Sequence, residues 1–525
     1  MKCSQSCLVV FVVFVLVSDA ACLQVTRDVP PLKDTEWSAV QGEAHAATST
    51  PHFLGPGVCR VAAEWTSRSI YEIVVDRFAP DQSITLWCGD LSKYCGGTFA
   101  GITDRLDYIQ GMGFDAISIS PVIENVDGGY HGYWPKDLFN LNGHFGSATS
   151  LKRLIQECHS RGIWVMVDVV MNHMGGVTDT LVQNFSPFNE SSHYHDCYYN
   201  CCGNCGCCST QVKDCKEEDT FTTESCRVSP HLIDLDQSHP YVEQRLLEWL
   251  HWIVSEFGFD GLRFDAVKHV SKSFWKKLKA SSPCFFLGDV PTDSACFLAS
   301  YQSARTMDGL LDHPTAATLR SVFGKAAPMT LLAAQLQTTR DAFVNGSTAL
   351  LGTFLDTHAL PRFLAFQPNQ SLLKGALAWT FLSQGIPVMY YGTEQGLSGG
   401  ADPENREPLW YSGFNSRAGL YSYVKQLQEV RKEYRVWEHE PVHVHAEEGL
   451  YMFMRGPLLV VLTNSINGGE FEGVLERSKS NESKFCDILA EQPSVDCFDV
   501  PEPGHKLKLS VQGYSTKVYA PFTVR

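Results

Sequence analysis

The stretch WVMVDVVMNH, residues 164–173, decides the fold of this chain. It is apolar for most of its length and ends in a polar tip that holds Asn172 and His173. An apolar run rich in valine is typical of a strand that is buried on both faces, as the strands of parallel sheets are. In a closed barrel of eight parallel strands, the carboxyl ends of the strands form the active face. The stretch therefore predicts a parallel strand with functional side chains at its carboxyl end.

Runs of the same kind recur along most of the chain and alternate with helical patterns. The further strands that we predict are Ile70–Phe78, Phe114–Val122, Gly261–Val267, Cys284–Val290, Leu350–His358 and Pro387–Gly396. Helical patterns lie at Ser150–Gly162 and Tyr241–Gly258. This alternation argues for an α/β fold, a parallel sheet covered by helices and closed into a barrel. An open doubly wound sheet stays as the alternative, although no glycine-rich phosphate loop follows the first strand, which weakens a nucleotide-binding interpretation.

Three segments depart from the alternation and predict further domains. Residues 22–61 are rich in Pro, Ser, Thr and Ala without a sustained period, so we expect a loose N-terminal extension. Residues 174–236 are irregular and rich in cysteine, which predicts an insertion after the third strand. From residue 441 to residue 525, short strands separated by Gly and Asn turns predict an all-β domain. The barrel is then built from residues 62–173 and 237–440.

The N-terminus and the cysteine content point to the secretory pathway. An apolar run of ten residues, 8–17, follows Lys2 and precedes small residues, so we predict a signal peptide over residues 1–21, cleaved near Ala20 or Ala21. The run is too short to span a bilayer, although an uncleaved anchor stays as the alternative. The chain has 19 cysteines, and its Asn-x-Ser sequons are at Asn184, Asn189, Asn345, Asn369 and Asn481. These features predict a secreted, glycosylated protein that has no membrane attachment after cleavage.

Charge and the polar strand ends narrow the class of ligand. The chain has 58 acidic and 42 basic side chains and a net charge of -16, so it has no electrostatic reason to bind nucleic acid. The side chains at the predicted strand ends include Asp168, Arg263, Asp265, Lys268, His269, Asp289 and His358, and the aromatic segment GGYHGYW precedes them. Carboxylates, imidazoles and aromatic rings at one barrel mouth suit a carbohydrate, because its hydroxyls bind polar groups and its apolar faces bind rings.

At these residues the chain resembles a known family. The segments YCGGTFAGITDRLDYIQGMGFDAI, GYHGYW, DVVMNHMGG, GLRFDAVKHV and LLGTF stand at matching places and in matching order in secreted α-amylases of the fungal type. The resemblance covers roughly residues 62 to 525. It implies a (β/α)8 barrel with a small domain B inserted after the third strand and a C-terminal β-sandwich. It also implies an α-1,4-glucan as the partner, and we expect the chain to be a monomer.

The resemblance implies a retaining mechanism, in which one carboxylate attacks the anomeric carbon and a second protonates the leaving oxygen. On the match, Asp265 is the nucleophile, and Arg263 keeps it ionised. The acid position, a glutamate in the family, is Asp289 here, in the segment FFLGDVPTD. The shorter side chain matters because proton transfer needs hydrogen-bond reach, and a small misplacement can cost about 100-fold in rate.

The third carboxylate of the family is absent. The seventh strand ends in HALPR, so Ala359 stands where the family has an aspartate, and Asp356 is too early in the strand to replace it. Loss of two charge-assisted hydrogen bonds costs about 3–6 kcal/mol. That corresponds to a rate loss of about 10² to 10⁴. We therefore expect an impaired hydrolase, with a catalytically inactive glucan-binding pseudoenzyme as the alternative and an interaction protein that kept only the scaffold as a third.

The resemblance also implies substrate and metal ligands. The matching substrate contacts are His131, Tyr133, Trp134, His173, Lys268, His269, His358, Asp402 and Arg406. The family holds a structural Ca²⁺ between domain B and the barrel with oxygen ligands, as this cation prefers. The matching ligands are Asn172, Asp234, the backbone carbonyl of His269 and, less securely, Glu224.

The cysteines fall into matched pairs and an unmatched cluster. Cys88 with Cys95 and Cys486 with Cys497 match family disulfides, and Cys284 with Cys296 is a further candidate pair. Eight cysteines lie between residues 197 and 226, where no histidine has zinc-like spacing, so we expect disulfides of undetermined pairing. Cys158 is expected to be a buried small apolar residue.

Overall fold

The computed structural model describes residues 59–81, 87–175, 179–195, 220–229, 232–475, 484–490, 496–499 and 505–521. The predicted signal peptide, nearly all of the predicted extension, most of the cysteine cluster and the sequon at Asn481 lie outside the described residues. Within the described residues, no helix has both the length and the apolar character needed to cross a membrane.

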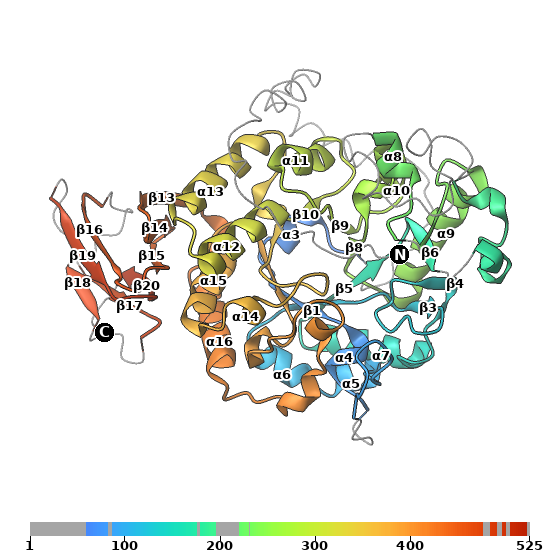
Figure 1. The fold of residues 1–525 in the computed structure, drawn as a ribbon, viewed down its shortest axis with the longest axis horizontal. Coiled ribbons are helices and arrows are strands. Elements are labelled where there is room, and N and C mark those ends of the chain that lie inside the picture. Colours follow the sequence, from blue (N-terminus) through green and yellow to red (C-terminus); the bar gives the residue numbers. More distant parts are fainter. Residues whose placement is uncertain are drawn as a thin grey trace, which may run out of the picture. The chain divides into compact units, whose positions relative to one another are not determined.

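Eight parallel strands close into a barrel, as predicted (Figure 1). Each strand lies beside its neighbour in chain order, and the last pairs with the first. The strands are β1 (Ile70–Ile73), β2 (Ala116–Ile119), β5 (Trp164–Val169), β8 (Gly261–Phe264), β9 (Phe285–Gly288), β10 (Gly309–Leu311), β11 (Leu351–Thr353) and β12 (Ile386–Tyr390). Seven of them overlap the predicted stretches. The prediction missed β10, because three residues are too few to show a strand pattern.

Helices surround the barrel and cover the outer faces of its strands (Figure 1). The helices are α3 (Ala62–Trp65), α4 (Val75–Phe78), α5 (Phe99–Thr103), α6 (Leu106–Gly111), α7 (Ala148–Ser160), α9 (Pro240–Phe257), α10 (Lys272–Ala280), α11 (Ala295–Ser303), α12 (His313–Lys325), α13 (Thr330–Ala342), α14 (Phe363–Phe366), α15 (Gln370–Leu382) and α16 (Gly419–Glu433). The predicted helices correspond to α7 and α9. The ends of α9 follow local sequence rules, because Pro240 occupies its first turn and Gly258 ends it with φ +78°.

The first predicted strand is shorter than expected. Residues 70–78 were predicted as one strand, but β1 ends at Ile73 and α4 follows. The chain turns there because Asp76 accepts hydrogen bonds from the backbone N–H groups of Cys95 (2.7 Å) and Gly96 (3.0 Å). A contact with a loop distant in sequence therefore overrides the local strand pattern.

Side chains of the barrel strands alternate between two hydrophobic cores, one inside the barrel and one between the barrel and the helices. In β5, Trp164 and Met166 pack inside the barrel with residues such as Phe285 and Leu287 of β9. The residues between them, such as Val165 and Val167, pack outward against the helices. Trp65 closes the amino-terminal end, with its ring 5.2 Å from that of Phe285. Because successive side chains of a strand point to opposite faces, the inward series continues to polar residues at the carboxyl end.

Two short hairpin-like sheets and one helix extend from this end. The first sheet pairs β3 (Ile123–Asn125) with β4 (Pro135–Leu141). The second pairs β6 (His173–Gly175) with β7 (Leu232–Asp234) and sets His173 opposite Asp234. The helix is α8 (Thr220–Ser225). The second sheet and α8 belong to the segment that we predicted as an insertion.

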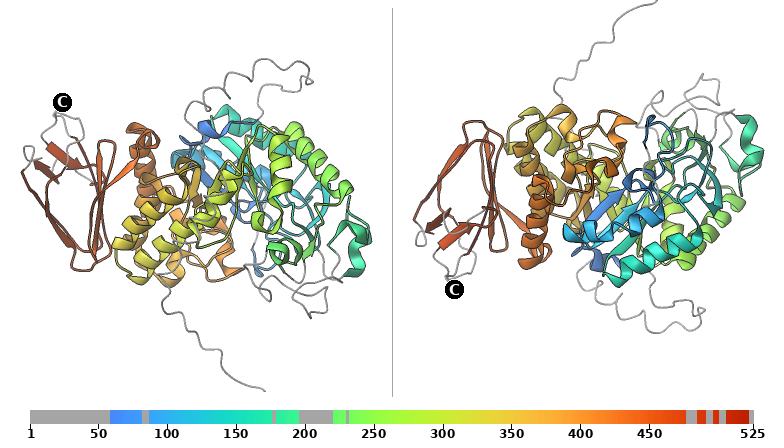
Figure 2. Two further views of the ribbon diagram at one scale, coloured as in Figure 1. Left: turned by 90° about the horizontal axis from the view of Figure 1, so that it is seen from above. Right: turned by 90° about the horizontal axis from the view of Figure 1, so that it is seen from below.

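The C-terminal residues form an all-β domain, as predicted (Figure 2). Its strands are β13 (Pro441–Ala446), β14 (Leu450–Arg455), β15 (Leu458–Thr463), β16 (Gly469–Gly473), β17 (Lys484–Asp487), β18 (Cys497–Asp499), β19 (Leu507–Val511) and β20 (Thr516–Pro521). The strands β16 and β19 form a separate two-stranded sheet. Met452 and Phe471 share a core between the two sheets, whereas the alternate residue Tyr451 packs on Trp379 of α15, with ring centroids 5.3 Å apart.

The disulfides confirm two predicted pairs and overturn the third. Cys88 pairs with Cys95, and Cys486 pairs with Cys497. Cys284 pairs with Cys59 and not with Cys296, so the candidate pair was wrong. The reason is that the segment after Cys59 runs beside the start of β9, where the Phe285 N–H donates to the Arg60 carbonyl (3.0 Å). Cys158 is buried and unpaired, as expected.

Candidate active site

Inward-facing positions of neighbouring strands bring charged side chains together at the carboxyl end of the barrel. On β5 the inward series Trp164 and Met166 leads to Asp168, which is 5% exposed. Arg263 lies on β8, and Asp265 follows that strand by one residue. Asp289 follows directly after β9. Strand alternation and barrel closure therefore gather three carboxylates around one arginine.

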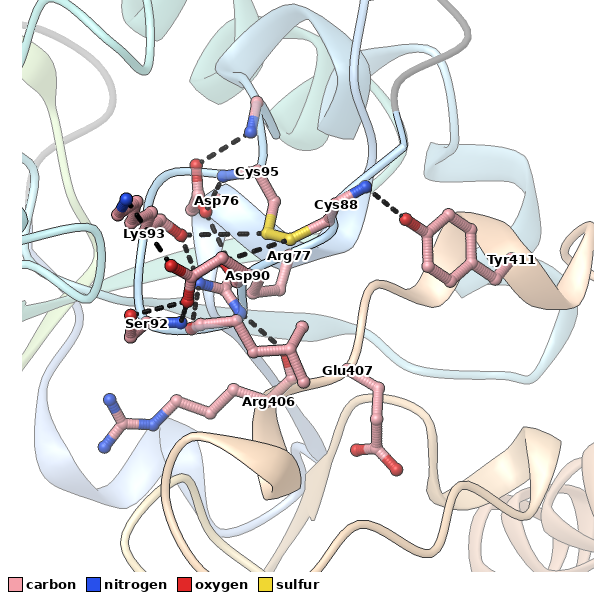
Figure 3. Close-up of a disulfide and its surroundings, with 12 residues drawn as sticks. Asp76, Arg77, Cys88, Asp90, Ser92, Lys93, Cys95, Arg406, Glu407 and Tyr411 are labelled. Atoms are coloured by element: carbon pink, nitrogen blue, oxygen red, sulfur yellow. Dashed lines mark hydrogen bonds and ion pairs between the residues drawn. A yellow bond between two sulfur atoms is a disulfide. The ribbon is translucent and has the colours of Figure 1, made fainter.

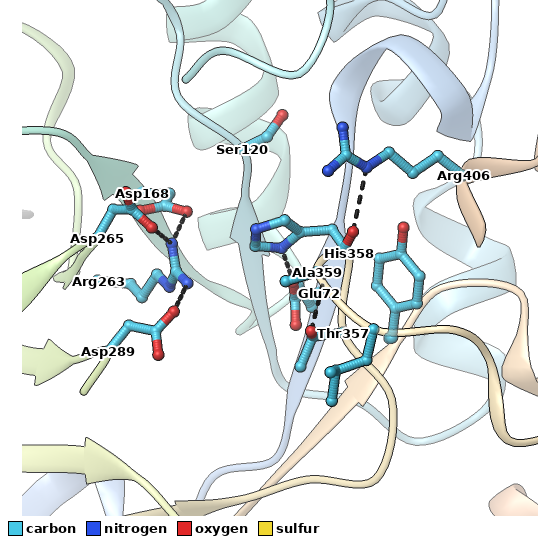
Figure 4. A network of polar contacts seen from close by, with 12 residues as sticks. Glu72, Ser120, Asp168, Arg263, Asp265, Asp289, Thr357, His358, Ala359 and Arg406 are labelled. Atoms are coloured by element: carbon cyan, nitrogen blue, oxygen red, sulfur yellow. Dashed lines mark hydrogen bonds and ion pairs between the residues drawn. The ribbon is translucent and has the colours of Figure 1, made fainter. Parts of the chain in front are cut away.

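The guanidinium of Arg263 binds all three carboxylates (Figure 4). Its Nη1 contacts Asp168 and lies 3.4 Å from Oδ1 of Asp265, and its Nη2 contacts Asp289. The Tyr133 hydroxyl donates to Asp168 Oδ2 at 2.6 Å. One positive charge thus faces three carboxyl groups in a mostly buried setting.

This imbalance divides the carboxyl groups by protonation. Burial raises the pKa of Asp168 to about 8, although the guanidinium of Arg263 acts in the opposite direction. Burial also acts to raise the pKa of Asp289, but Arg263 and His313 hold it well below its ordinary value. Burial thus favours the protonated form of Asp168, whereas Arg263 and His313 favour the carboxylate form of Asp289.

His313 is a site residue that the sequence analysis missed. It is the first residue of α12, and only Asp312 separates it from the short β10 (Gly309–Leu311). Its Nε2 lies 2.6 Å from Oδ1 of Asp289, so both oxygens of that carboxylate are bonded, one to Arg263 and one to His313. The only sequence signal was the segment DGLLDHP, and the unpredicted strand within it concealed the position of the histidine.

Glu72 is the second residue that was missed. It is an inward residue of β1, and its Oε1 lies 2.9 Å from Nδ1 of His358. His358 stacks on Tyr133, with ring centroids 4.8 Å apart. The three side chains line a narrow pocket in the barrel mouth together with Asp168 and Arg263. The sequence did contain a signal for Glu72, because it is a charged residue at an inward position of an otherwise apolar strand.

The third carboxylate of the family has no replacement at its own position. Ala359 follows His358, and its N–H donates to Thr357 Oγ1 (3.0 Å; Figure 4). Asp356 is buried and accepts from Arg320 at 2.9 Å and from the Phe363 N–H at 2.8 Å. Asp356 is therefore committed to a structural role, in agreement with its early place in the strand.

The histidines beside the aromatic segment are buried and neutral. His131 accepts from the Tyr133 N–H (3.0 Å), and its ring packs edge-on against Trp134. Nε2 of His173 lies 3.1 Å from the Tyr133 carbonyl. Burial lowers the pKa of both histidines, that of His131 well below its ordinary value. Neutral imidazoles can both donate to and accept from hydroxyl groups.

A loop after β12 presents a further polar pair. Nη1 of the buried Arg406 lies 3.1 Å from the exposed carboxylate of Asp402 and donates to the Tyr130 hydroxyl at 3.0 Å. Arg77 holds this loop in place, because its Nη1 donates to the Arg406 carbonyl (3.0 Å; Figure 3). The other amino group of Arg77 donates to carbonyls of the loop that the Cys88–Cys95 disulfide closes.

The comparisons with known proteins identify the family of the chain. Residues 70–440 match the family model of the α-amylase catalytic domain. The chain belongs to the α-amylase family. It is 38% identical to α-amylase 1 of Lipomyces kononenkoae over 70% of this chain and 59% of that protein. It is 34% identical to α-amylase 2 of Schwanniomyces occidentalis over 88% of this chain and 91% of that one.

Solved structures of α-amylases share the fold. An α-amylase of Malbranchea cinnamomea superposes with a TM-score of 0.79 and 32% identity, over 88% of this chain and 98% of that one. An α-amylase of Geobacillus thermoleovorans, solved with acarbose, gives a TM-score of 0.73 and 28% identity over 88% of this chain and 99% of that one.

The chain has a wide groove beside the cluster formed by Arg263 and its three carboxyl groups. The groove lies between α8, η6 (Val267–His269), α11 and α12. Lys268 lines it and donates to the Pro291 carbonyl at 3.0 Å. Glu224 and His313 line it as well. The groove therefore connects the neighbourhood of Asp289 with the segment predicted as domain B.

The residues predicted to hold calcium fit that ion in part. Oδ1 of Asn172 and Oδ1 of Asp234 are buried and accept no hydrogen bond from the described residues, which is costly unless a cation or water binds them. His269 is close to α8, since its Nδ1 lies 3.0 Å from the Thr223 carbonyl. Burial lowers the pKa of its ring to about 4. Glu224 lines the groove. The described residues hold no cluster of three His, Cys, Asp or Glu side chains suited to a metal, so amide and backbone oxygens would have to complete the shell.

Proposed function

We propose that this chain is a secreted hydrolase of α-1,4-glucans that works by the retaining mechanism with reduced turnover. The observation that carries the proposal is Asp265 beside Arg263 at the barrel mouth, facing a wall formed by Tyr133 and His358. A carboxylate next to a cation supplies a nucleophile, and an aromatic wall supplies a surface for a sugar ring.

Asp265 attacks the anomeric carbon, and Arg263 lies beside it, with Nη1 3.4 Å from Oδ1 of Asp265. Asp289 occupies the position of the family's acid. Because both oxygens of Asp289 are bonded to donors, Arg263 and His313, its carboxylate form is stabilised and it has no proton to donate near neutral pH. Together with the missing carboxylate at Ala359, this supports a lowered rate.

The substrate contacts form two groups. Tyr133, Trp134, His131, His173 and His358 surround the sugar at the point of cleavage. Further contacts come from the exposed carboxylate of Asp402 with Arg406 on one side, and from Lys268 and His269 on the other. The support is their position around the mouth and the match to relatives named α-amylases.

A structural calcium ion belongs to this proposal. Asn172, Asp234 and the carbonyl of His269 would hold it, with Glu224 as the weaker candidate, and the two orphan oxygens support the site. When bound, the ion clamps the inserted segment to the barrel by Coulomb attraction and takes no part in bond cleavage. Secretion and a monomeric state complete the proposal, and the disulfides support secretion.

The test is the release of reducing ends from soluble starch by the purified protein. Asp265→Asn is the blank, and Asp289→Glu/Ala359→Asp is the repaired form. Release by the native chain well above the blank, and faster release by the repaired form, is the expected result. The proposal fails if the native chain equals the blank.

A catalytically inactive glucan-binding protein is the second candidate. The observation that favours it is the double loss, an ion-paired Asp289 and Ala359, at two of the three catalytic positions. Binding of maltoheptaose without turnover in the native chain, with turnover in the repaired form, would establish this candidate.

A further inference from the structure

The site contains an ionised carboxylate where the family has its proton donor, and this leaves the leaving oxygen without an acid. Asp289 is bonded through Oδ2 to Arg263 and through Oδ1 to His313. With both oxygens bonded to donors and its pKa held well below the ordinary value by Arg263 and His313, despite burial, it has no proton to give near neutral pH. If the chain is a hydrolase, another group must protonate the leaving oxygen.

His313 is the group that stands next to this position. Its side chain is 20% exposed and lines the wide groove beside the catalytic cluster, together with Lys268. Its backbone is fixed at the start of α12, where the side chain of the preceding Asp312 caps the helix by accepting from the Thr315 N–H (3.1 Å). Its ring packs edge-on against Phe354, with centroids 5.1 Å apart. The imidazole is thus held in one place while part of it stays open to a ligand.

The hydrogen bonds of the ring leave one nitrogen for chemistry. Nε2 is engaged by Asp289 at 2.6 Å, and no described residue bonds to Nδ1. A carboxylate bonded to one nitrogen of an imidazole fixes the orientation of the ring and stabilises its charged form. When protonated, the ring presents an N–H at the other nitrogen, as a general acid requires.

We propose that His313, oriented by Asp289, is the proton donor of this site. The proposal rests on the proposed hydrolase function and deepens it. In the first step, Asp265 forms a bond to the anomeric carbon, the glycosidic C–O bond breaks, and the leaving oxygen takes a proton from His313. In the second step, water attacks the anomeric carbon and gives a proton back to His313, and the bond to Asp265 breaks. Asp289 stays a carboxylate throughout and acts as a positioning residue.

The pair made by His159 and Asp260 offers a matched control. There Nε2 of His159 lies 2.7 Å from Oδ2 of Asp260, a contact of the same kind. Asp260 precedes β8 by one residue, so this pair lies at the amino-terminal end of the strand, opposite to the catalytic mouth.

The experiment compares two substrates that differ in their need for an acid. Soluble starch needs protonation of the leaving oxygen, whereas fluoride leaves α-maltosyl fluoride without it. His313→Gln keeps an N–H that can donate to Asp289 but cannot transfer a proton at neutral pH. General acid catalysis contributes about 10²–10⁴-fold, so we expect His313→Gln to lose at least about 100-fold on starch and less than about fivefold on the fluoride. His159→Gln should match the native chain on both substrates, and Asp265→Asn should lose both activities.

Each other outcome counts against the proposal in a recognisable way. If His313→Gln loses both activities equally, or neither, His313 is not the acid, while the hydrolase function stands. If the native chain cleaves the fluoride but not starch, no acid operates, and only the nucleophile is retained. If the native chain cleaves neither substrate, the hydrolase function fails, and the role of His313 fails with it. Folding of each variant is checked by its thermal transition, and His313→Asn repeats the comparison if His313→Gln does not fold.

Discussion

The two walls of the barrel mouth are held together in different ways. On the wall formed by the aromatic segment and the loops after β11 and β12, several side chains have separate partners, such as Glu72 for His358 and Tyr130 for Arg406. On the wall formed by β5, β8 and β9, a single guanidinium serves Asp168, Asp265 and Asp289. The first wall can lose one contact and keep the others, whereas the second couples every carboxylate to one residue. Under the proposed function, this difference explains how Asp289 and Ala359 can replace two family carboxylates while the residues proposed to bind sugar stay in place.

Replacing Asp265 with asparagine gives the sharpest contrast between the walls. An amide cannot attack the anomeric carbon, so turnover of starch should fall by at least about 10⁴-fold. The binding wall is untouched, so the Kd for maltoheptaose should change little. Initial rates and calorimetric titration measure the two quantities. Residual turnover within tenfold of the native chain would show that Asp265 is not the nucleophile.

Removal of Arg263 should break the second wall as a unit. Arg263→Leu leaves Asp168 and Asp289 without their cation in a buried site, and loss of one partner of a buried ion pair costs about 3–5 kcal/mol. Urea denaturation measures the free energy of unfolding. The control is Arg435→Leu, because Arg435 pairs with Glu438 on the surface with 64% of its side chain exposed. That change should cost less than about 0.5 kcal/mol. If both substitutions lowered the free energy of unfolding by the same amount, Arg263 would not hold the three carboxyl groups together as described.

Calcium should stabilise the folded chain by joining the barrel to the inserted segment. Saturation to 100 times the Kd adds about 2.7 kcal/mol to the stability of the folded chain, so EGTA should lower the thermal midpoint and added Ca²⁺ should restore it. Asp234→Asn should abolish this response. The surface variant Asp107→Asn should keep it, because that side chain is 90% exposed. If neither EGTA nor added Ca²⁺ changed the thermal midpoint of the native chain, the result would count against the calcium site.

The outer part of the binding wall should show the smallest effect. Asp402→Ala removes one exposed hydrogen-bonding carboxylate, worth about 1 kcal/mol, and should weaken maltoheptaose binding by about fivefold. The KM for long glucans should rise more than kcat falls. Glu404→Ala, in the same loop, removes an exposed acid that has no ion pair among the described residues and should leave binding unchanged. If both variants behave alike, the loop charge matters and the specific contact does not.

Part of the site could be predicted from sequence because its residues lie in long local motifs. The segment GLRFDAVKHV placed Arg263 and Asp265 by itself, and FFLGDVPTD placed Asp289. The segment around Glu72 gave its strand but not its partner, since His358 lies 286 positions further along the chain. His313 was missed with the three-residue strand before it. The Cys59–Cys284 bond was missed because its cysteines are 225 positions apart and join through the geometry of the barrel end.

The sequence by itself determined the barrel, the all-β C-terminal domain and the family. It could do so because strand alternation and motif identity are properties of short contiguous segments. Only the tertiary structure decided that one arginine bridges three carboxylates, that Glu72 holds His358, and that His313 reaches Asp289. Those contacts exist because closure of eight parallel strands brings their carboxyl ends to one mouth, and side chains distant in the chain then share the same few ångströms of low-dielectric space.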